Sequence, residues 1–374
     1  MKNICYLPWV GLDISPQGEF KPCCKYKNTI ANNIVDYLSS KELSDLQQDF
    51  LNDQQSPGCQ RCWDDESAGL PSKRQLDWQY ILQEREPKLD KLAILSFPFG
   101  NSCNLACRIC GSHSSSTWSI EAKKLLPIFP NIPIFKHQRF YKDKKFIDNI
   151  KSLCGELLHV EFPGGEPFIT GIEEQLDFLD FLIDNGSENI SLHYITNITK
   201  FPKQAFWDRW QHFKKVDIQL SIDGIEQQFE YNRWPAKWTL ILKHIRQYQQ
   251  KVQSNSWLQL SVSHSVSIFT VYYLPEFLTW CRVMTLPDPY LGMVANPKWY
   301  SIKVLPDSVK SLIRDKLDRF ILPEIISYMN SENLVNEFDN TIKYIKILDQ
   351  HRNQNFSETF PEFYQLLKDA ECQI

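Results

Sequence analysis

Short apolar segments alternate with amphipathic segments through the middle of the chain. Patterns typical of buried strands occupy 92–97, 157–162, 190–195, 216–222 and 257–267, and a sixth falls within 290–304. Helical periodicity covers 172–184, 236–250 and 274–282. Strands that alternate with helices predict right-handed βαβ units and a parallel sheet. These strands are too few for a complete eight-unit barrel, so we expect an α/β fold built on a partial (β/α)6 TIM-like barrel.

Two further regions flank the predicted barrel. Alternating residues at Val10–Ile14 and Glu19–Lys21 enclose a Pro-Gln-Gly turn and predict a hairpin. Helical patterns follow at 36–52 and at about 73–86, and the chain after 305 is mostly helical and carries no chemical motif. We therefore expect a small N-terminal cysteine-rich hairpin/helix domain at 1–70, a linker at 71–91, the barrel at 92–305 and a helical C-terminal region at 306–374.

The composition is that of a globular protein. Hydrophobic residues make up 43% of the chain and the net charge is −4, which excludes a wholly disordered chain and gives no electrostatic footprint for nucleic acid. Pro8, Gly11 and Asp13 interrupt any secretory signal, and no stretch approaches the ~18 apolar residues of a membrane span. We therefore expect a cytoplasmic protein with no membrane partner, in which structural disulfides are disfavoured.

Cysteines are concentrated near the N-terminus. Eight of the 11 cysteines lie in the first 110 residues. Clustered cysteines in a reducing compartment suggest metal ligands or redox chemistry, whereas Cys154, Cys281 and Cys372 are typical of scattered buried thiols.

The first cysteine cluster is the segment CNLACRIC, with Cys103, Cys107 and Cys110 directly after a predicted strand. Three soft thiolates in one loop favour zinc or an iron–sulfur cluster. A closed zinc site needs a fourth ligand, for which His113 is a candidate. Three ligands on a four-iron cluster instead leave one iron open to a substrate or cofactor, which is a catalytic arrangement.

Polar or glycine-rich residues also follow the next predicted strands, at the edge where parallel α/β folds place their functional groups. Gly164 and Gly165 allow close approach of the backbone to a ligand, and Glu166 beside them suits a bound amine. The other candidates at strand ends are Asn197, Ser221 and Asp223, with Arg233 a short distance later. A strand-ending turn is the alternative for these residues, and a surface position is the alternative for Arg233.

The C-x3-C-x2-C loop resembles the cysteine motif of the radical S-adenosylmethionine (SAM) superfamily. The resemblance implies that Cys103, Cys107 and Cys110 hold a catalytic [4Fe-4S] cluster whose open iron binds SAM. It places Ile109 near the adenine, where the family commonly has an aromatic residue. It also implies that the Gly164-Gly165-Glu166-Pro167 motif binds the SAM amino group. Asn197, Ser221 and Asp223 would contact the ribose and methionine, and Arg233 the SAM carboxylate.

A second set of cysteines lies in the N-terminal region. Cys59-x2-Cys62 has the spacing of a metal knuckle, and the hairpin can bring Cys5 and Cys23 beside it. Cys24 points to the opposite face if both residues lie on a strand, so we favour Cys23 as the ligand. This region resembles the SPASM/twitch module of radical SAM enzymes, which implies a second, auxiliary [4Fe-4S] cluster. A zinc knuckle is the alternative.

The resemblance implies an enzyme that cleaves SAM reductively and abstracts a hydrogen atom from its substrate. Its partners would be an electron donor such as flavodoxin or ferredoxin, and a ribosomal peptide as substrate. Radical oxidation or rearrangement of a small metabolite is the alternative. A hypothesis of another class is a non-enzymatic zinc- or cluster-binding interaction protein, which leaves the strand-end residues unexplained.

Overall fold

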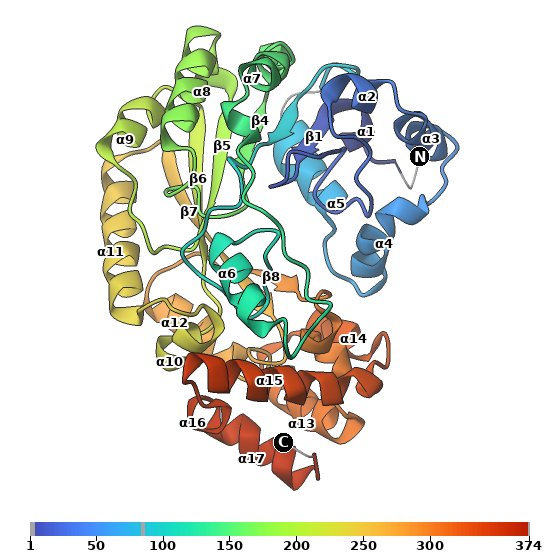
Figure 1. Ribbon diagram of the computed structural model, residues 1–374, viewed down its shortest axis with the longest axis vertical. Helices are drawn as coiled ribbons and strands as arrows, with labels where there is room; N and C mark the ends of the chain where they lie inside the picture. The colour runs from blue at the N-terminus through green and yellow to red at the C-terminus, as the bar shows by residue number, and fades with distance from the viewer. Residues whose placement is uncertain (1–3, 84–86, 373–374) are drawn as a thin grey trace. The chain divides into compact units, whose positions relative to one another are not determined.

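The computed structural model describes residues 4–83 and 87–372. Its sheet has eight strands in the order β2-β1-β3-β4-β5-β6-β7-β8 (Figure 1). The strands are β1 (Gly11–Ile14), β2 (Phe20–Lys21), β3 (Ile94–Ser96), β4 (His159–Phe162), β5 (Ser191–Thr196), β6 (Lys215–Ser221), β7 (Leu258–Val266) and β8 (Tyr290–Met293). β1, β3, β4 and β5 pair in parallel, as do β7 and β8. The predicted α/β fold is confirmed, and a strand occurs within every segment where the sequence predicts one.

The predicted N-terminal hairpin is also confirmed, because β1 and β2 pair in antiparallel fashion with Ile14 opposite Phe20. Its turn contains Gly18, whose φ of 85° lies in the left-handed region that glycine adopts without strain. The sequence did not predict where this hairpin docks. β1 runs parallel to β3, with Asp13 opposite Ser96, so the hairpin extends the sheet of the barrel.

The chain folds into two compact units. The first comprises the described residues up to Asn104, Gly111–Gln219 and Gln247–Gln259. The second comprises Leu105–Cys110, Leu220–Arg246 and the described residues from Leu260 onward.

Helices surround the strands of the first unit. They include α1 (Leu7–Val10), α2 (Ile34–Leu38), α3 (Lys41–Leu51), α4 (Gln60–Ser67), α5 (Lys73–Asp77), α6 (Ser116–Leu125), α7 (Lys144–Lys151), α8 (Ile172–Asp184) and α9 (Gln204–Trp210). α8 and α9 lie side by side (Figure 1). α3 buries Leu46 and Phe50 in a core that includes Leu7 and Trp63. The same core contains Ala93, Ile94 and Leu158, so the N-terminal region packs directly against the start of β3 and the segment before β4.

The single helix predicted over 36–52 is wrong at its start. Two helices occupy this region, because the helical conformation is interrupted at Ser39 and Ser40. The Ser40 hydroxyl accepts a hydrogen bond from the Leu43 backbone N–H and so begins a new helix. The expected helix at about 73–86 is present as α5 and a π-helical turn at Trp78–Leu82, and its last residues, 84–86, lie outside the described residues.

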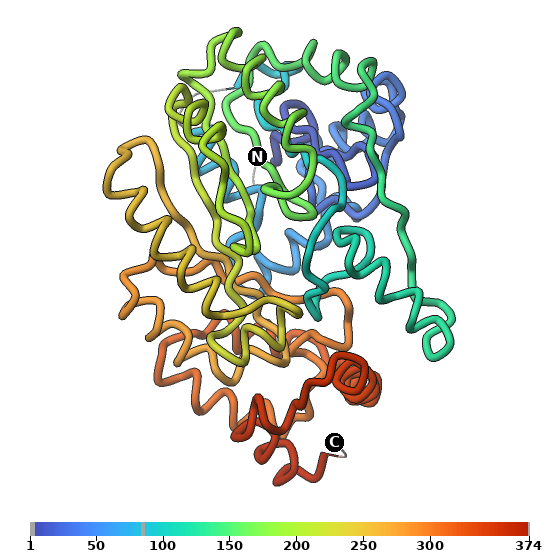
Figure 2. Tube along the Cα trace, turned by 60° about the vertical axis from the view of Figure 1, so that its left-hand side comes forward, coloured from blue at the N-terminus to red at the C-terminus, as the bar shows by residue number. Residues whose placement is uncertain are grey.

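The second unit carries the helical C-terminal region, as predicted. Its helices include α10 (Glu226–Asn232), α12 (Leu274–Val283), α13 (Asp307–Leu317), α14 (Pro323–Asn330), α15 (Phe338–Arg352), α16 (Phe356–Thr359) and α17 (Pro361–Asp369). Another helix, α11, spans Trp238–Ser254. Helices α13 to α17 gather at the C-terminal end of the trace (Figure 2). Within the described part of the chain, no helix is both long and apolar enough to cross a membrane.

Candidate active site

The glycine pair after β4 is required by the backbone. Gly164 and Gly165 have φ of 72° and 54°, a conformation that other residues adopt only with strain. A Cβ atom on Gly165 would lie 2.5 Å from the carbonyl oxygen of Ser102. The next backbone N–H, that of Glu166, donates to the same oxygen at 2.8 Å. The loop after β4 is therefore pressed against the segment that leads into Cys103.

Glu166 is fully buried and connects two strand ends. One carboxylate oxygen accepts a hydrogen bond from the Thr196 hydroxyl at 2.8 Å. The other accepts the backbone N–H of Asn197 at 2.7 Å. The carboxylate thus fixes the end of β5 against the glycine loop, a positioning role that the motif alone did not suggest.

Asn197 connects the ends of β4 and β5 to the segment that follows β3. Its side-chain N–H donates to the Cys103 thiol sulfur at 3.4 Å and to the Asn104 side chain at 3.2 Å. Thr199 donates to the Asn197 side-chain oxygen and so orients the amide. The first unit therefore places the ends of β3, β4 and β5 together, with one predicted cysteine ligand among them.

The second unit holds Cys107, Cys110 and the residues predicted after β6. Arg233 and Asp223, predicted separately, form a buried ion pair with Nη2 and Oδ2 2.8 Å apart. The other Asp223 oxygen accepts the backbone N–H of Ser265. Burial raises the pKa of the Cys107 thiol, and the positive charge of Arg233 opposes that shift. Arg233 thus supplies positive charge at the cysteine loop.

The rest of the cysteine loop is held through its backbone. The N–H groups of Ala106 and Arg108 donate to the carbonyls of Trp234 and Asn232, at 2.7 and 2.8 Å. Ile109 is half-buried, as are Cys107 and Cys110. Ser221 is buried, and the hydroxyl of Ser263 donates to its hydroxyl at 3.5 Å.

The N-terminal cysteines line a cavity with an empty volume of about 300 Å³ in the first unit. All four predicted ligands border it: Cys5, Cys23, Cys59 and Cys62. Leu7 and Phe50 line it as well, together with the cationic side chains of Lys25, Lys73 and Arg74. Burial raises the pKa of all four thiols, and that of Cys59 reaches about 12. A positively charged metal centre would stabilise the thiolate forms of these cysteines.

Two local features complete this cavity. The backbone N–H of Arg74 hydrogen bonds to the Cys62 thiol and opposes the rise of its pKa. The Arg74 side chain makes a two-pronged ion pair with Glu66 and lies over the Trp63 ring. Cys24 is not among the lining residues. As the side chains stand, no three His, Cys, Asp or Glu residues of the described chain are arranged as a metal-binding group, so the four thiols share a cavity without forming a ligand set in this structure.

A row of polar residues crosses one face of the sheet in the first unit, which sequence reasoning missed. Asp13, Ser96, Glu161 and His193 lie opposite one another on β1, β3, β4 and β5. The only sequence signal is a polar residue at alternate positions in otherwise buried strands.

Two ion pairs define this row. His193 Nδ1 lies 2.8 Å from the Asp217 carboxylate, whose hydrogen bond and charge raise the pKa of His193 against the effect of burial. Lys73 Nζ lies 2.9 Å from Glu161; burial alone would raise the pKa of Glu161, but Lys73 lowers it to about 2. Burial raises the pKa of Asp13 to about 6. A histidine held at Nδ1 by a carboxylate is oriented for proton transfer at Nε2.

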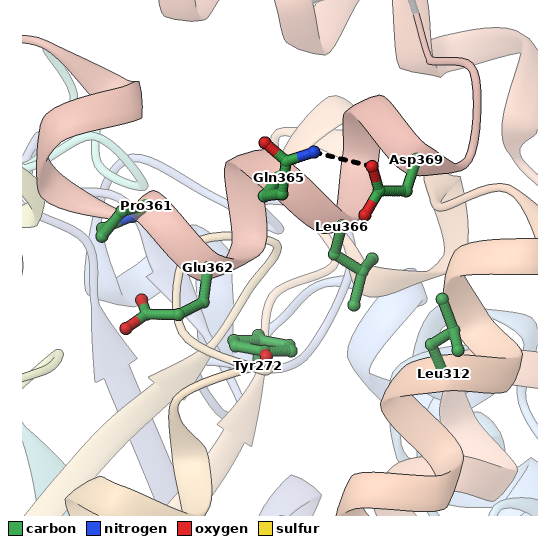
Figure 3. Close-up of a pocket in the computed structure, with 7 residues that line it drawn as sticks. All are labelled: Tyr272, Leu312, Pro361, Glu362, Gln365, Leu366 and Asp369. Carbon is green, nitrogen blue, oxygen red and sulfur yellow. Dashed lines mark hydrogen bonds between the residues drawn. The ribbon is translucent and has the colours of Figure 1, made fainter.

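A further pocket lies in the C-terminal region and involves none of the predicted site residues (Figure 3). Tyr272, Leu312 and Leu366 give it apolar walls, and Gln365 donates a hydrogen bond to Asp369 at its rim.

Comparisons with known proteins complete the description of the site. A scan against protein-family models finds no match to this chain. A search of curated proteins finds no match either.

Several solved structures do match. The anaerobic sulfatase-maturating radical SAM enzyme anSMEcpe, with bound AdoMet, is 15% identical, with a TM-score of 0.44 over 61% of this chain and 62% of that chain. SuiB of Streptococcus suis bound to S-adenosylmethionine is 13% identical, with a TM-score of 0.37 over 64% of this chain and 47% of that chain. SuiB bound to its precursor peptide SuiA is 12% identical, with a TM-score of 0.38 over 75% and 53%.

This chain covers less than two thirds of the length of each of these three proteins. The cysteine and glycine motifs of this chain resemble those of the radical SAM superfamily, and the three solved structures above are similar to it over part of its length.

Proposed function

We propose that this chain is a radical SAM enzyme that abstracts a hydrogen atom from its substrate. Cys103, Cys107 and Cys110 bind the catalytic cluster, and the glycine loop after β4 receives the SAM amino group. When bound, a [4Fe-4S] cluster supplies the electron that cleaves SAM to methionine and a 5′-deoxyadenosyl radical. The polypeptide binds and orients SAM and keeps water away from the radical.

One observation carries this proposal. Glu166 and Asn197 come from two strand ends and are hydrogen bonded to each other. The backbone N–H of Glu166 also donates to Ser102, and the side chain of Asn197 donates to Cys103. If the cysteine spacing had arisen by chance, there would be no reason for residues of the other strand ends to hydrogen bond to the cysteine segment. Asn197 donates its amide N–H to the Cys103 sulfur, a bond that stabilises a thiolate ligand.

The N-terminal cavity supports a second [4Fe-4S] cluster on Cys5, Cys23, Cys59 and Cys62. The four thiols line a single cavity. Cys23 is one of its lining residues, whereas the neighbouring Cys24 is not. A cluster held by these four cysteines would accept an electron after hydrogen abstraction or bind the substrate. A zinc ion on the same thiolates is the alternative outcome of the iron analysis below.

The substrate we propose is a ribosomal peptide, because enzymes with SPASM or twitch modules often modify such peptides. Oxidation or rearrangement of a small metabolite is the alternative. A short precursor-peptide gene beside the gene for this chain would favour the peptide, and co-expression of the two followed by mass spectrometry would detect the modification. We further propose a cytoplasmic location and reduction by a flavodoxin or ferredoxin.

Anaerobic reconstitution tests the proposal. The protein should bind about eight iron atoms per chain and form 5′-deoxyadenosine from SAM only when a reductant is present. Cys107→Ala should abolish this product, measured by liquid chromatography and mass spectrometry. Cys372→Ala is the matched control and should keep the wild-type rate. Protein that binds zinc alone and never cleaves SAM would overturn the proposal and favour the non-enzymatic hypothesis.

The auxiliary site is tested separately by Cys59→Ala. Iron should fall from about eight to about four atoms per chain, and some SAM cleavage should survive because the catalytic cluster uses other cysteines. Unchanged iron content would contradict the ligand assignment.

A further inference from the structure

Arg108 lies inside the cysteine motif, between Cys107 and Ile109, and is 1% exposed. Nη2 pairs with Asp349 of α15 at 2.5 Å and donates to the Gln354 side chain at 3.0 Å. The motif arginine is therefore anchored by residues more than 200 positions later in the chain.

Aromatic and backbone contacts complete the anchor. The Arg108 guanidinium lies 3.6 Å from the centre of the Tyr231 ring, and Nε donates to the Tyr231 carbonyl at 3.2 Å. A planar guanidinium can stack on a ring and donate in its own plane at the same time, which lysine cannot do. The residue type at this position is therefore set by a specific geometry and not by charge alone.

The acceptors on the C-terminal side are themselves fixed. The second oxygen of Asp349 accepts the backbone N–H of Phe356 at 2.7 Å, at the start of α16. Gln354 donates to the Glu230 carbonyl in α10 at 3.3 Å. α10 leads directly into the segment whose carbonyls hold the loop backbone. The side-chain anchor and the backbone anchor of the cysteine loop are thus connected through Gln354.

Removing one partner of this buried pair would leave the other charge without compensation, which burial makes costly. The loop carries Cys107 and Cys110 on either side of Arg108 and Ile109. A displaced Arg108 therefore moves the two cysteines that flank it.

We infer that Asp349 and Gln354 position the cysteine loop through Arg108, so that the helical C-terminal region is a working part of the SAM site. The inference rests on the proposed function. Arg108, Asp349 and Gln354 are positioning residues, because they act through the cysteine loop.

The decisive variant is Asp349→Asn in the anaerobically reconstituted holoenzyme. Asparagine keeps one oxygen acceptor but loses the charge that Arg108 requires. Asp339→Asn is the matched control, since Asp339 is exposed near the start of the same helix. Arg108→Lys keeps the positive charge but loses the planar guanidinium group. Gln354→Leu is a milder variant for use if Asp349→Asn folds poorly.

Two measurements separate positioning from general stability. Hydrogen exchange of the amides of Ala106 and Arg108 should quicken at least about tenfold in Asp349→Asn, with the N-terminal region unchanged. The KM for SAM should rise about tenfold while kcat changes less than about threefold. Arg108→Lys should give intermediate values in both measurements.

The outcomes remain distinct from those of the proposed function. If wild-type protein never cleaves SAM, the proposed function fails, while hydrogen exchange still tests the anchor. Exchange and KM values in Asp349→Asn equal to those of Asp339→Asn would overturn the inference. Uniformly faster exchange across the whole chain would also overturn it, because that pattern reports general destabilisation.

Discussion

At the scale of single residues, surroundings decide which member of a residue type has a chemical role. Cys154 and Cys281 are buried thiols outside both cysteine sets. Cys23 lines the N-terminal cavity, whereas Cys24 beside it does not. Sequence spacing predicted the candidates in both sets. The structure adds what each thiol contacts, and those contacts make single substitutions informative.

The first prediction concerns Gly165. Alanine at this position would have to adopt a φ of 54°, and its Cβ atom would clash with the Ser102 carbonyl oxygen. We therefore expect Gly165→Ala to lower the free energy of unfolding by about 1–3 kcal/mol. SAM cleavage should fall at least tenfold, by about 1.4 kcal/mol or more in transition-state stabilisation, as the loop shifts. Gly155→Ala is the control, because nothing lies within 4 Å of its new Cβ. Equal thermal melting and equal cleavage rates in the two variants would contradict the prediction.

The second prediction concerns the hydrogen bond from Asn197 to the Cys103 sulfur. Asn197→Ala removes a donor that stabilises the more negative, reduced cluster. We therefore expect the midpoint potential of the catalytic cluster to fall by roughly tens of millivolts. A redox titration followed by electron paramagnetic resonance measures this potential. Asn189→Ala, at an exposed position, should leave it unchanged; a shift of equal size in both variants would count against the bond.

The third prediction concerns pH. The pKa of Asp13 rises from 3.8 to about 6 on folding, so the folded state binds the proton more tightly. Ionised Asp13 is therefore destabilising above pH 6, and the effect fades as the pH falls toward 3.8. Asp13→Asn should raise the melting temperature at pH 8, through a gain of up to ~3 kcal/mol, and raise it less at pH 5.

The control for this pH effect is Asp184→Asn, at an exposed position on α8. Its melting temperature should follow that of the wild type at both pH values. A gain from Asp13→Asn that is the same at pH 5 and pH 8 would show that burial of charge is not the cause.

At the scale of elements, Arg74 lies in the first turn of α5, pairs with Glu66 of α4 and lies over the ring of Trp63, which is also in α4. One side chain thus holds both helices beside Cys62. The position of Cys62, a proposed cluster ligand, depends on this contact between two short helices, which have little stability of their own.

The fourth prediction follows from this contact. Arg74→Met should loosen the cavity, and the protein should lose about four of its eight iron atoms while SAM cleavage persists in part. Arg319→Met, at an exposed position, should keep the full iron content. Loss of iron from both clusters together would indicate general unfolding and contradict a local role for Arg74.

Element by element, local patterns predicted well what depends on neighbouring residues. The strands that precede Cys103, Gly164 and Asn197 all overlap their predicted segments, because a short run of apolar or alternating residues is a local signal. The break at Ser39 and Ser40 was missed, since either serine also fits a continuous helix. Only the hydrogen bond from Leu43 to Ser40 decides between the two.

At the scale of the whole molecule, the unpredicted features are contacts between distant segments. The pairing of β1 with β3 joins residues about 80 positions apart and extends the sheet of the barrel. The polar row of Asp13, Glu161 and His193 depends on the register of several strands. No local pattern carries such information, so the sequence predicted the chemistry of the strand ends but not the residues that support them.

The distance along the chain between Arg108 and Asp349 also sets an order of events during synthesis. The four thiols of the N-terminal cavity lie within the first 62 residues, so that site can form early as the chain leaves the ribosome. The cysteine loop obtains its anchor only when Asp349 emerges, 241 residues after Arg108. The side-chain anchor of the cysteine loop can therefore form only after the residues that line the N-terminal cavity have been synthesised.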